Sequence, residues 1–477
     1  MVCGTTSNAG KTTLVAGLCR LMARHGISVA PFKAQNMALN SAVTKGGHEI
    51  GRAQYLQAFA AGLEPHVSMN PVLLKPTGDR TSQIVVMGEA IGEMSAVEYH
   101  QYKPELFDVV IEALDALAAK HDVVLLEGAG SPAELNLLSN DIVNLRLAQR
   151  TNCKAVVVGD IDPGGVFASL FGTVKILPSV LADLIHGFII NKLRGDPALL
   201  LDGTDQLEAL CGVPTFGIVP MLPELRLDAE DSLNLKSSTG PGRSIDVAVV
   251  RLPRLSNFTD FDPLCLEPDV SVRFVTSASE IGSPDLAIVP GTKSTVEDLA
   301  WLQKTGIAER LELLAGSKAT ILGICGGYQM LGMSIDDPVE SKTGRVDGLG
   351  LLDCTTQFEE RKVLAQVSGQ ALNSAISGYQ IHHGRVTNTD PDQSWISLAS
   401  GEPEGTRCDT ILGTTIHGIF ESDEFRQQFL TKVAARADKS FTSGKTPFVS
   451  RRDKQLDRLA DHLDLHLDMG NIVNLIA

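Results

Sequence analysis

The sequence predicts an α/β protein built from two parallel-sheet domains. Short apolar runs alternate with amphipathic stretches, which is the pattern of successive β-α-β units. Two such series follow one another, separated by a polar Gly/Ser/Pro-rich segment at residues 236–244. The chain has 477 residues, which is enough for two large packed cores. We therefore expect one domain over residues 1–235, a linker over 236–244 and a second domain over 245–437.

The first series contains four apolar runs, each typical of a buried parallel strand. These runs are Ser28–Phe32, Val123–Leu126, Ala155–Val158 and Gly187–Ile190. The amphipathic stretch Leu106–Lys120 predicts one of the helices between them. Each run ends in small or polar residues, so ligands are expected at the carboxyl edge of this sheet.

The second series begins with three predicted strands, and its helices begin near Val296 and Tyr328. The strands are Ile245–Arg251, Leu286–Val289 and Ala319–Ile324. Residues 350–416 are then rich in β pattern. Near the end, leucines recur at helical spacing, so residues 438–477 are expected to form a helical tail packed on the body.

Composition excludes several classes of protein. The net charge of −16 argues against a nucleic-acid or anionic-membrane surface. The sequence lacks an uncharged apolar run of about 18 residues, so no transmembrane helix is expected. No secretory signal is expected from the first residues. The eight cysteines form no CxxC pair, which disfavours a zinc site and suits reduced thiols in the cytoplasm.

The start of the chain resembles a phosphate-binding loop, with one extra residue between its glycines. Glycines let backbone amides turn toward a phosphate, a lysine reaches the β- and γ-oxygens, and the next hydroxyl binds Mg²⁺. The alternative is a Gly-rich turn before a helix. The expected nucleotide-binding residues are Gly4, Thr5, Asn8, Ala9, Gly10, Lys11, Thr12 and Thr13.

Two strand ends are expected to complete this nucleotide site. Glu127 ends an apolar run, where its carboxylate is placed to hold Mg²⁺ together with Thr12. An acid facing water is the alternative. Asn191 ends another run and could bind the adenine edge through its amide, although a turn asparagine is equally compatible.

The second half contains a nucleophile elbow with sulfur in place of oxygen. An apolar strand leads into Cys325, two glycines and a helix. The glycines permit the strained turn, the helix N-terminus favours the thiolate, and the Gly326 amide can contribute to an oxyanion hole. The alternative is a buried structural cysteine.

A cysteine nucleophile needs a histidine, and His417 follows a strand and precedes a glycine. His382 and His383 compete for the role. Gly291 follows another strand in a tight turn, where its amide is either the second oxyanion donor or only part of a βα turn.

Together these motifs resemble the cobyric acid synthase family over almost the whole chain. The resemblance also includes Ala30–Ser41, Glu49–Gln54, Asn70–Gly78, Glu127–Glu134, Asp141–Asn144, Asn191–Asp196, Gly323–Leu331, Gly378–Arg385 and His417–Phe420. It implies a P-loop domain similar to dethiobiotin synthetase and a flavodoxin-like class I glutamine amidotransferase domain.

The implied reaction uses ATP, Mg²⁺ and glutamine to amidate the b, d, e and g carboxylates of a corrinoid, adenosylcobyrinic a,c-diamide. Cys325 is the implied nucleophile and His417 its base. Thr12 and Glu127 are the implied Mg²⁺ ligands, with Glu49 a further metal or substrate candidate. His417 is followed by Gly-Ile rather than Pro-Glu, so the site is expected to be a Cys–His dyad without Glu421. Pro163 stands where the family has Arg.

Two other functions remain open from the sequence. The nearest is amidation of the a and c carboxylates of cobyrinic acid, although the string Gln35–Asn40 favours cobyric acid synthase. The more distant one is a P-loop ATPase switch carrying an inert amidotransferase-like domain. The presence of both Cys325 and His417 argues against that inertness.

Overall fold

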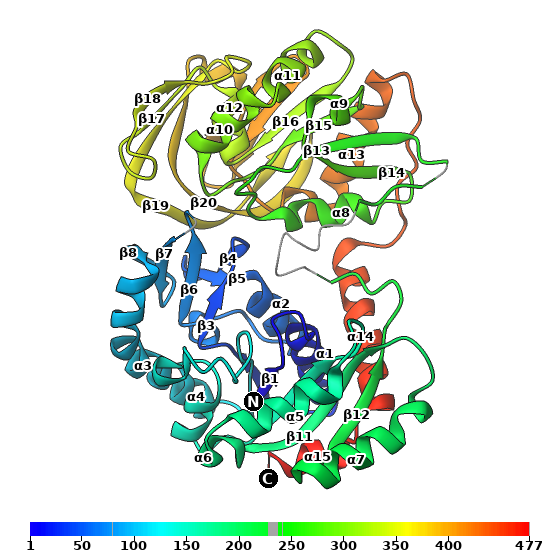
Figure 1. The fold of residues 1–477 in the computed structure, drawn as a ribbon. Coiled ribbons are helices and arrows are strands. Elements are labelled where there is room, and N and C mark those ends of the chain that lie inside the picture. The colour runs from blue at the N-terminus through cyan, green and yellow to red at the C-terminus, as the bar shows by residue number, and fades with distance from the viewer. Residues whose placement is uncertain (79, 228–236, 241, 477) are drawn as a thin grey trace.

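The computed structural model describes residues 1–78, 80–227, 237–240 and 242–476 (Figure 1). Residues 228–235 of the expected first domain, and 236 and 241 of the expected linker, lie outside the described residues. Of the rest of that segment, Ser238 forms a β-bridge with Val272.

The N-terminal half is built on a parallel sheet, as the alternating pattern predicts. Its strand order is β2-β9-β1-β10-β11-β12, with β1 and β9 joined by the bridge between Val2 and Glu127. The strands are β1 (Val2–Gly4), β2 (Val29–Phe32), β9 (Val123–Leu126), β10 (Ala155–Asp160), β11 (Ile185–Leu193) and β12 (Thr215–Pro220). The main helices are α1 (Lys11–Arg24), α2 (Arg52–Ala60), α3 (Ala96–Ala118), α4 (Leu145–Arg150), α5 (Val166–Ile176), α6 (Ser179–Ala182) and α7 (Leu201–Cys211).

An additional β region, which the sequence did not predict, lies between β2 and α3. It contains a four-stranded sheet of order β3-β6-β7-β8 and the hairpin β4-β5. The strands are β3 (Gln35–Met37), β4 (Ser41–Val43), β5 (Glu49–Gly51), β6 (Val72–Pro76), β7 (Thr81–Val86) and β8 (Glu89–Ser95). This region faces the C-terminal half (Figure 1).

The C-terminal half has a flavodoxin-like sheet. Its parallel strands have the order β14-β13-β15-β16-β24, which is 2-1-3-4-5 in chain order, and β23 adds an antiparallel edge. The strands are β13 (Ile245–Val250), β14 (Val270–Val275), β15 (Leu286–Val289), β16 (Thr320–Ile324), β23 (Thr406–Cys408) and β24 (Ile411–Thr414). The helices around it include α8 (Asp262–Cys265), α9 (Ala278–Ile281), α10 (Thr295–Lys304), α11 (Ile307–Ala315), α12 (Gly326–Leu331) and α13 (Asp423–Arg436).

The C-terminal half contains a second sheet, and this sheet contacts the N-terminal half. The expected β-rich segment, residues 350–416, contains one long strand, β19 (Cys354–Ala371), which pairs with β20 (Ser374–Asn388). The other members are β17 (Ser334–Asp337), β18 (Gly344–Asp347), β21 (Ile396–Leu398) and β22 (Pro403–Glu404). Tyr379 and Ile381 of β20 share an apolar cluster with residues of the N-terminal half such as Phe32. The two halves therefore pack directly on each other.

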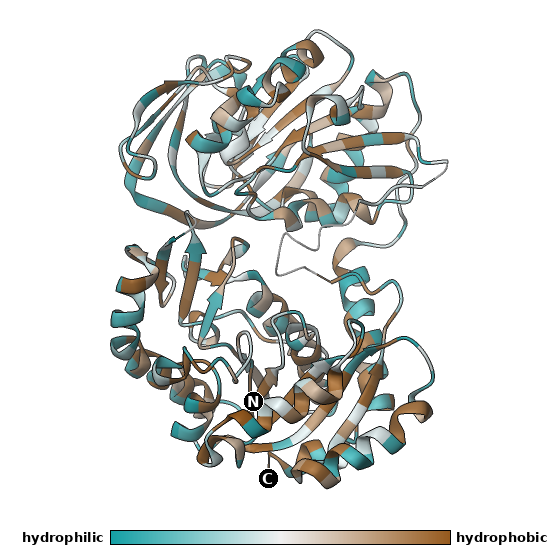
Figure 2. Cartoon of the chain, in the orientation of Figure 1, coloured by the Kyte–Doolittle hydropathy of each residue, from teal (hydrophilic) through white to brown (hydrophobic). Residues whose placement is uncertain are grey.

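The C-terminal helices return to the N-terminal half. Helix α14 (Phe448–His466) packs Leu456, Leu459 and Leu463 into the apolar cluster that contains α1, and α15 (Met469–Asn474) follows it. Both chain ends consequently lie in the same body (Figure 1). Hydrophobic residues are concentrated in the strands of both main sheets (Figure 2). None of the helices that the structure describes is long and apolar enough to span a membrane.

Candidate active sites

Cys325 stands on a strained turn between β16 and α12. Its backbone has φ 51° and ψ −110°, in a region that non-glycine residues rarely adopt. A Cβ at Gly327 would lie 1.9 Å from the Val289 carbonyl oxygen, so only glycine permits the helix to approach β15 this closely. The predicted elbow is therefore present, and its strain is stored at the sulfur-bearing residue.

His417 is brought to Cys325 across 92 residues of sequence. It follows β24, which pairs with β16, and its side chain lines the same cavity as that of Cys325. The expected dyad has a third member that the sequence analysis missed. The carboxylate of Asp260 accepts from His417 Nδ1 at 2.7 Å and from the Gly418 amide at 2.8 Å. Glu421 instead forms an ion pair with Arg52.

The electrostatic environment keeps a proton on His417. Burial lowers the pKa of His417, but the charges of Asp260 and Cys325 outweigh burial and raise the pKa to about 10. At neutral pH the imidazole is therefore an imidazolium, hydrogen-bonded to the carboxylate of Asp260. This arrangement supplies a general acid beside the nucleophile.

The competing histidines, His382 and His383, line the same cavity as His417, but their pKa values are lowered where that of His417 is raised. Burial lowers the pKa of His382 to about 3 and that of His383 below its ordinary value. Nδ1 of His382 hydrogen-bonds the Gly384 carbonyl, and Nδ1 of His383 hydrogen-bonds the Glu359 carbonyl. The pKa of His417 is instead raised, in part by the nearby Cys325, which favours His417 as the partner of the thiol.

The two expected oxyanion glycines also converge on Cys325. A Cβ at Gly291 would lie 2.9 Å from His417 Cε1, and one at Gly326 would lie 3.2 Å from the Thr292 amide nitrogen. The turn after β15 therefore lies against the elbow. This placement suits the expected use of both amides on a developing oxyanion.

Replacing Asp260 with asparagine is expected to lower glutamine hydrolysis by roughly 10³-fold, because the carboxylate that orients the ring and stabilises its protonated form is lost. Since Asp260 raises the pKa of His417, its loss lowers that pKa. The alkaline limb of the glutaminase pH profile should then move to lower pH. The measurement is kcat against pH for glutamate release. An unchanged profile with an unchanged rate would contradict the assignment.

The phosphate-binding loop forms as the sequence predicts. Gly10 has φ 96° and caps helix α1, which begins at Lys11. The Lys11 ammonium donates to three carbonyls around the loop, those of Thr6 at 2.9 Å, Ser7 at 3.3 Å and Gly130 at 3.2 Å. A flexible cation thus lies over the loop, at the position where loops of this kind bind the β- and γ-phosphates of a nucleotide.

Thr12 and Glu127, the expected metal ligands, are brought together. The Thr12 hydroxyl donates to Glu127 Oε1 at 2.8 Å. The same carboxylate accepts from Lys33 at 2.9 Å and from Gln57 at 2.6 Å. A hydroxyl and one carboxylate beside a phosphate loop are the oxygen donors that Mg²⁺ uses with nucleotides, so these residues fit the ion.

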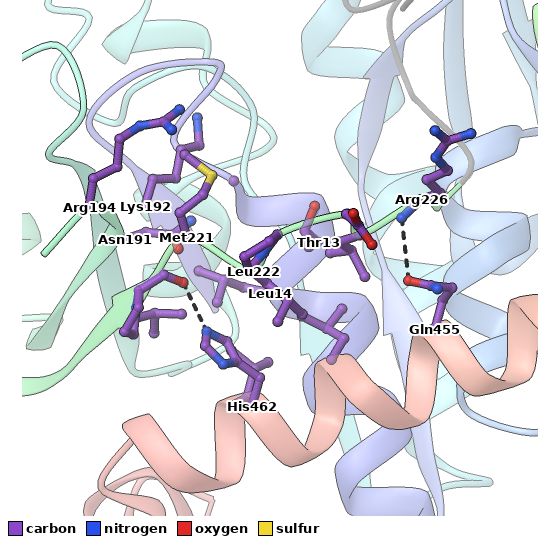
Figure 3. Close-up of a pocket in the computed structure, with 18 of the residues that line it drawn as sticks. Thr13, Leu14, Asn191, Lys192, Arg194, Met221, Leu222, Arg226, Gln455 and His462 are labelled. Atoms are coloured by element: carbon purple, nitrogen blue, oxygen red, sulfur yellow. Dashed lines mark hydrogen bonds between the residues drawn. The ribbon is translucent and has the colours of Figure 1, made fainter. Parts of the chain in front are cut away.

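A cavity beside the loop is large enough for a nucleotide base and is partly built by the C-terminal helix α14 (Figure 3). Asn191 lines it and donates from its amide to the Ala9 carbonyl at 2.9 Å, so this residue anchors the loop. From α14, His462 bonds the Pro220 carbonyl at 2.8 Å and Gln455 accepts from the Arg226 amide at 3.4 Å. The tail therefore completes the wall of this site.

Glu49 is placed away from the expected metal pair, at the contact between the two halves. Its two carboxylate oxygens accept from Lys75 at 2.6 Å and from Lys362 at 2.7 Å, and its side chain is 1% exposed. Lys75 belongs to β6 and Lys362 to β19, so this buried triad links the halves. The geometry gives Glu49 a role in the interface and no contact with Thr12 or Glu127 that would support metal binding.

Backbone and ring contacts extend this link to His417 and its surroundings. Tyr379 stacks on His417 with ring centroids 5.4 Å apart, and its hydroxyl donates to the Ser41 carbonyl at 3.0 Å. The Ser41 amide donates to the Asn257 side chain at 3.1 Å, three residues before Asp260. The N-terminal half thus contacts Tyr379, which stacks on His417, and the side chain of Asn257.

A nucleotide-binding half joined to a cysteine glutaminase defines the class of protein: an amidating ligase that takes nitrogen from glutamine. Residues 1–235 match the CobQ/CobB/MinD/ParA nucleotide binding domain, and residues 246–425 match the CobB/CobQ-like glutamine amidotransferase domain. The chain is 50% identical to a cobyric acid synthase of Saccharopolyspora erythraea, over 100% of this chain and 94% of that protein. The corresponding enzyme of Mycobacterium sp. (strain KMS) is 49% identical, over 100% and 96%, and that of Rhodococcus jostii 50%, over 100% and 95%. This chain belongs to the cobyric acid synthase family.

Proposed function

We propose that this chain amidates the b, d, e and g carboxylates of adenosylcobyrinic a,c-diamide, with ATP and glutamine as co-substrates. The observation that carries the proposal is the full-length likeness to enzymes named cobyric acid synthase, in a chain that retains both reaction centres. We place the reaction in the cytoplasm, where thiols such as its eight cysteines stay reduced.

The glutaminase reaction begins with attack of the Cys325 sulfur on the side-chain amide of glutamine. Amides of Gly291 and Gly326 stabilise the oxyanion that develops. His417, held by Asp260 at 2.7 Å, gives its proton to the departing nitrogen as the C–N bond breaks. Water then attacks the thioester, which releases glutamate and regenerates the thiol. One glutamine and one water yield one glutamate and one ammonia.

The synthetase reaction overcomes the poor leaving group of a carboxylate. A corrinoid carboxylate attacks the γ-phosphorus of ATP, which gives an acyl phosphate and ADP. Lys11 and the loop amides neutralise the transferring phosphoryl group. Mg²⁺, held by Thr12 and Glu127, would supply further positive charge on the phosphates. Ammonia then displaces phosphate from the acyl carbon, and one proton is released as the amide forms.

Ammonia must travel from Cys325 to the synthetase half before water protonates it. Lys75 of the N-terminal half lines the same cavity as Cys325 and His417. We take this shared wall, which includes two members of the Glu49–Lys75–Lys362 triad, as the start of an enclosed path. The two lysines disfavour passage of ammonium and leave neutral ammonia as the species that passes.

Replacing Lys362 with methionine is expected to uncouple the two reactions. Glu49 keeps Lys75 as a partner, so the buried carboxylate is not left alone. The interface loosens, ammonia escapes, and glutamate formed per amide formed should rise above one. The measurement is glutamate and product amide in the same reaction.

The matched control is Lys432→Met, which removes an exposed lysine from α13. It should keep the ratio at one. A ratio of one in Lys362→Met as well would rule out the triad as a barrier to leakage.

The proposed substrate is tested by mass spectrometry of adenosylcobyrinic a,c-diamide incubated with the protein, Mg-ATP and glutamine. The proposal predicts a ladder of products with successive carboxylates converted to amides. Amidation of cobyrinic acid instead, without turnover of the diamide, would assign the sister reaction. ATP binding with no amidation of either would overturn the ligase assignment.

A further inference from the structure

The cavity at Cys325 carries an ion pair that the glutaminase mechanism does not use. Lys293 and Glu340 both line this cavity together with Cys325 and His417. Their side chains form an ion pair with each other, and both are largely buried, at 6% and 17% exposure. Burying two charges costs several kcal/mol, and their mutual attraction offsets this cost only in part. A functional role would explain an ion pair at this position.

Both charges are held at fixed positions relative to the reacting groups. Lys293 comes two residues after Gly291, and its amide donates to the Arg254 carbonyl at 3.1 Å, which fixes the turn. Glu340 belongs to a turn that the buried carboxylate of Asp337 organises by accepting from three successive amides, at 3.0, 2.8 and 2.8 Å. The backbone that carries each member of the pair is therefore fixed by hydrogen bonds.

The remaining charges of the cavity are otherwise engaged. Lys75 and Lys362 each bond an oxygen of Glu49. His382 is neutral, because burial lowers its pKa to about 3. Among the described residues that line the cavity, Glu340 is the one carboxylate. A cationic group that enters beside Cys325 therefore meets Glu340.

Free glutamine presents two opposite charges at the end remote from its amide. With the amide carbon at Cys325, its α-ammonium and α-carboxylate must lie against the wall of the cavity. A pair of fixed opposite charges is complementary to that head group, and the site stays neutral both before and after binding. A carboxamide that lacks either charge would leave one member of the pair unmatched.

We infer that Lys293 and Glu340 form the subsite that selects free glutamine, with Glu340 binding the α-ammonium and Lys293 the α-carboxylate. The inference rests on the proposed glutaminase function and adds to it the groups that set its specificity. Burial lowers the pKa of Lys293, but Glu340 outweighs burial and raises it, which keeps the lysine charged. The alternative is a purely structural lock between the two turns.

The test compares glutamine with two analogues, each of which lacks one charge. Glutaramate lacks the α-amino group, and 4-aminobutanamide lacks the α-carboxylate. A hydrogen bond to a charged group contributes about 1.5–3 kcal/mol, so its loss lowers kcat/KM by roughly 10–150-fold. Glu340→Gln should show this loss for glutamine, mainly in KM, and almost none for glutaramate. Lys293→Met should show it for glutamine and almost none for 4-aminobutanamide.

Retained turnover of one analogue shows that each variant is folded. The double variant Lys293→Glu with Glu340→Lys keeps an ion pair but exchanges the positions of the two charges. Its kcat/KM for glutamine should remain low. The controls Lys304→Met and Glu312→Gln change exposed residues of α10 and α11 and should leave all three substrates unaffected.

Equal losses for glutamine and both analogues in the single variants, or full recovery in the exchanged pair, would establish a structural lock and overturn the inference. Failure of the unmodified protein to hydrolyse glutamine would instead overturn the proposed function. The two failures are therefore distinguishable within one set of assays.

Discussion

Replacing Cys325 with alanine is expected to abolish glutamine-dependent amidation while ammonia-dependent amidation continues. Loss of the nucleophile removes the covalent route, and such losses amount to about 10⁴–10⁶-fold in related chemistry. In the proposed mechanism the acyl phosphate forms in the other half, at the loop that contains Lys11, so its formation does not need the thiol. The measurement is product amide with glutamine or with ammonium chloride at alkaline pH, where free ammonia is abundant.

The matched control is Cys408→Ala, because Cys408 is an exposed thiol on β23, remote in sequence from the elbow. It should retain both activities. Glutamine-dependent amidation that survives in Cys325→Ala would place the nucleophile elsewhere. Loss of the ammonia-dependent reaction as well would show that the two centres are not separable as proposed.

Replacing Lys11 with methionine is expected to lower amidation by about 10³-fold with either nitrogen donor, because the cation over the phosphate loop is lost. Glutamine hydrolysis should persist, since Cys325, His417 and Asp260 lie in the other half. Release of ADP and of glutamate, measured in one reaction, separates these effects.

The matched control is Lys120→Met, an exposed lysine just after α3. It should preserve release of both products. Normal ADP formation by Lys11→Met would exclude the loop as the site of phosphoryl transfer. Parallel loss of glutamate release would instead indicate that occupancy of the loop controls the glutaminase.

The sequence predicted those parts of the molecule that local pattern determines. Apolar runs such as Val123–Leu126 are strands because both faces of a parallel sheet are buried. The elbow at Cys325 was predictable because only flanking glycines permit its turn. The pairing of Thr12 with Glu127 followed from the convergence of strand ends and phosphate loop at one edge of the sheet.

The features that the sequence did not predict depend on contacts between distant segments. Asp260 lies 157 residues before His417, and no spacing rule connects them. Its nearest signal is an acidic residue that lies between Phe258 and Phe261. Glu49 looked like a metal candidate because a lone acid carries no information about its partners. The placement of α14 against the nucleotide cavity likewise depends on tertiary packing.

In the proposed reaction, nitrogen passes from glutamine to the corrinoid inside the protein. The most direct test supplies glutamine labelled with ¹⁵N in its amide, together with unlabelled ammonium, and counts ¹⁵N in each product amide by mass spectrometry. If nitrogen is transferred internally, nearly every new amide carries ¹⁵N, whatever the ammonium concentration at neutral pH. Labelling that falls to the isotope ratio of the solution would show that ammonia is released before it is used, and would contradict the account.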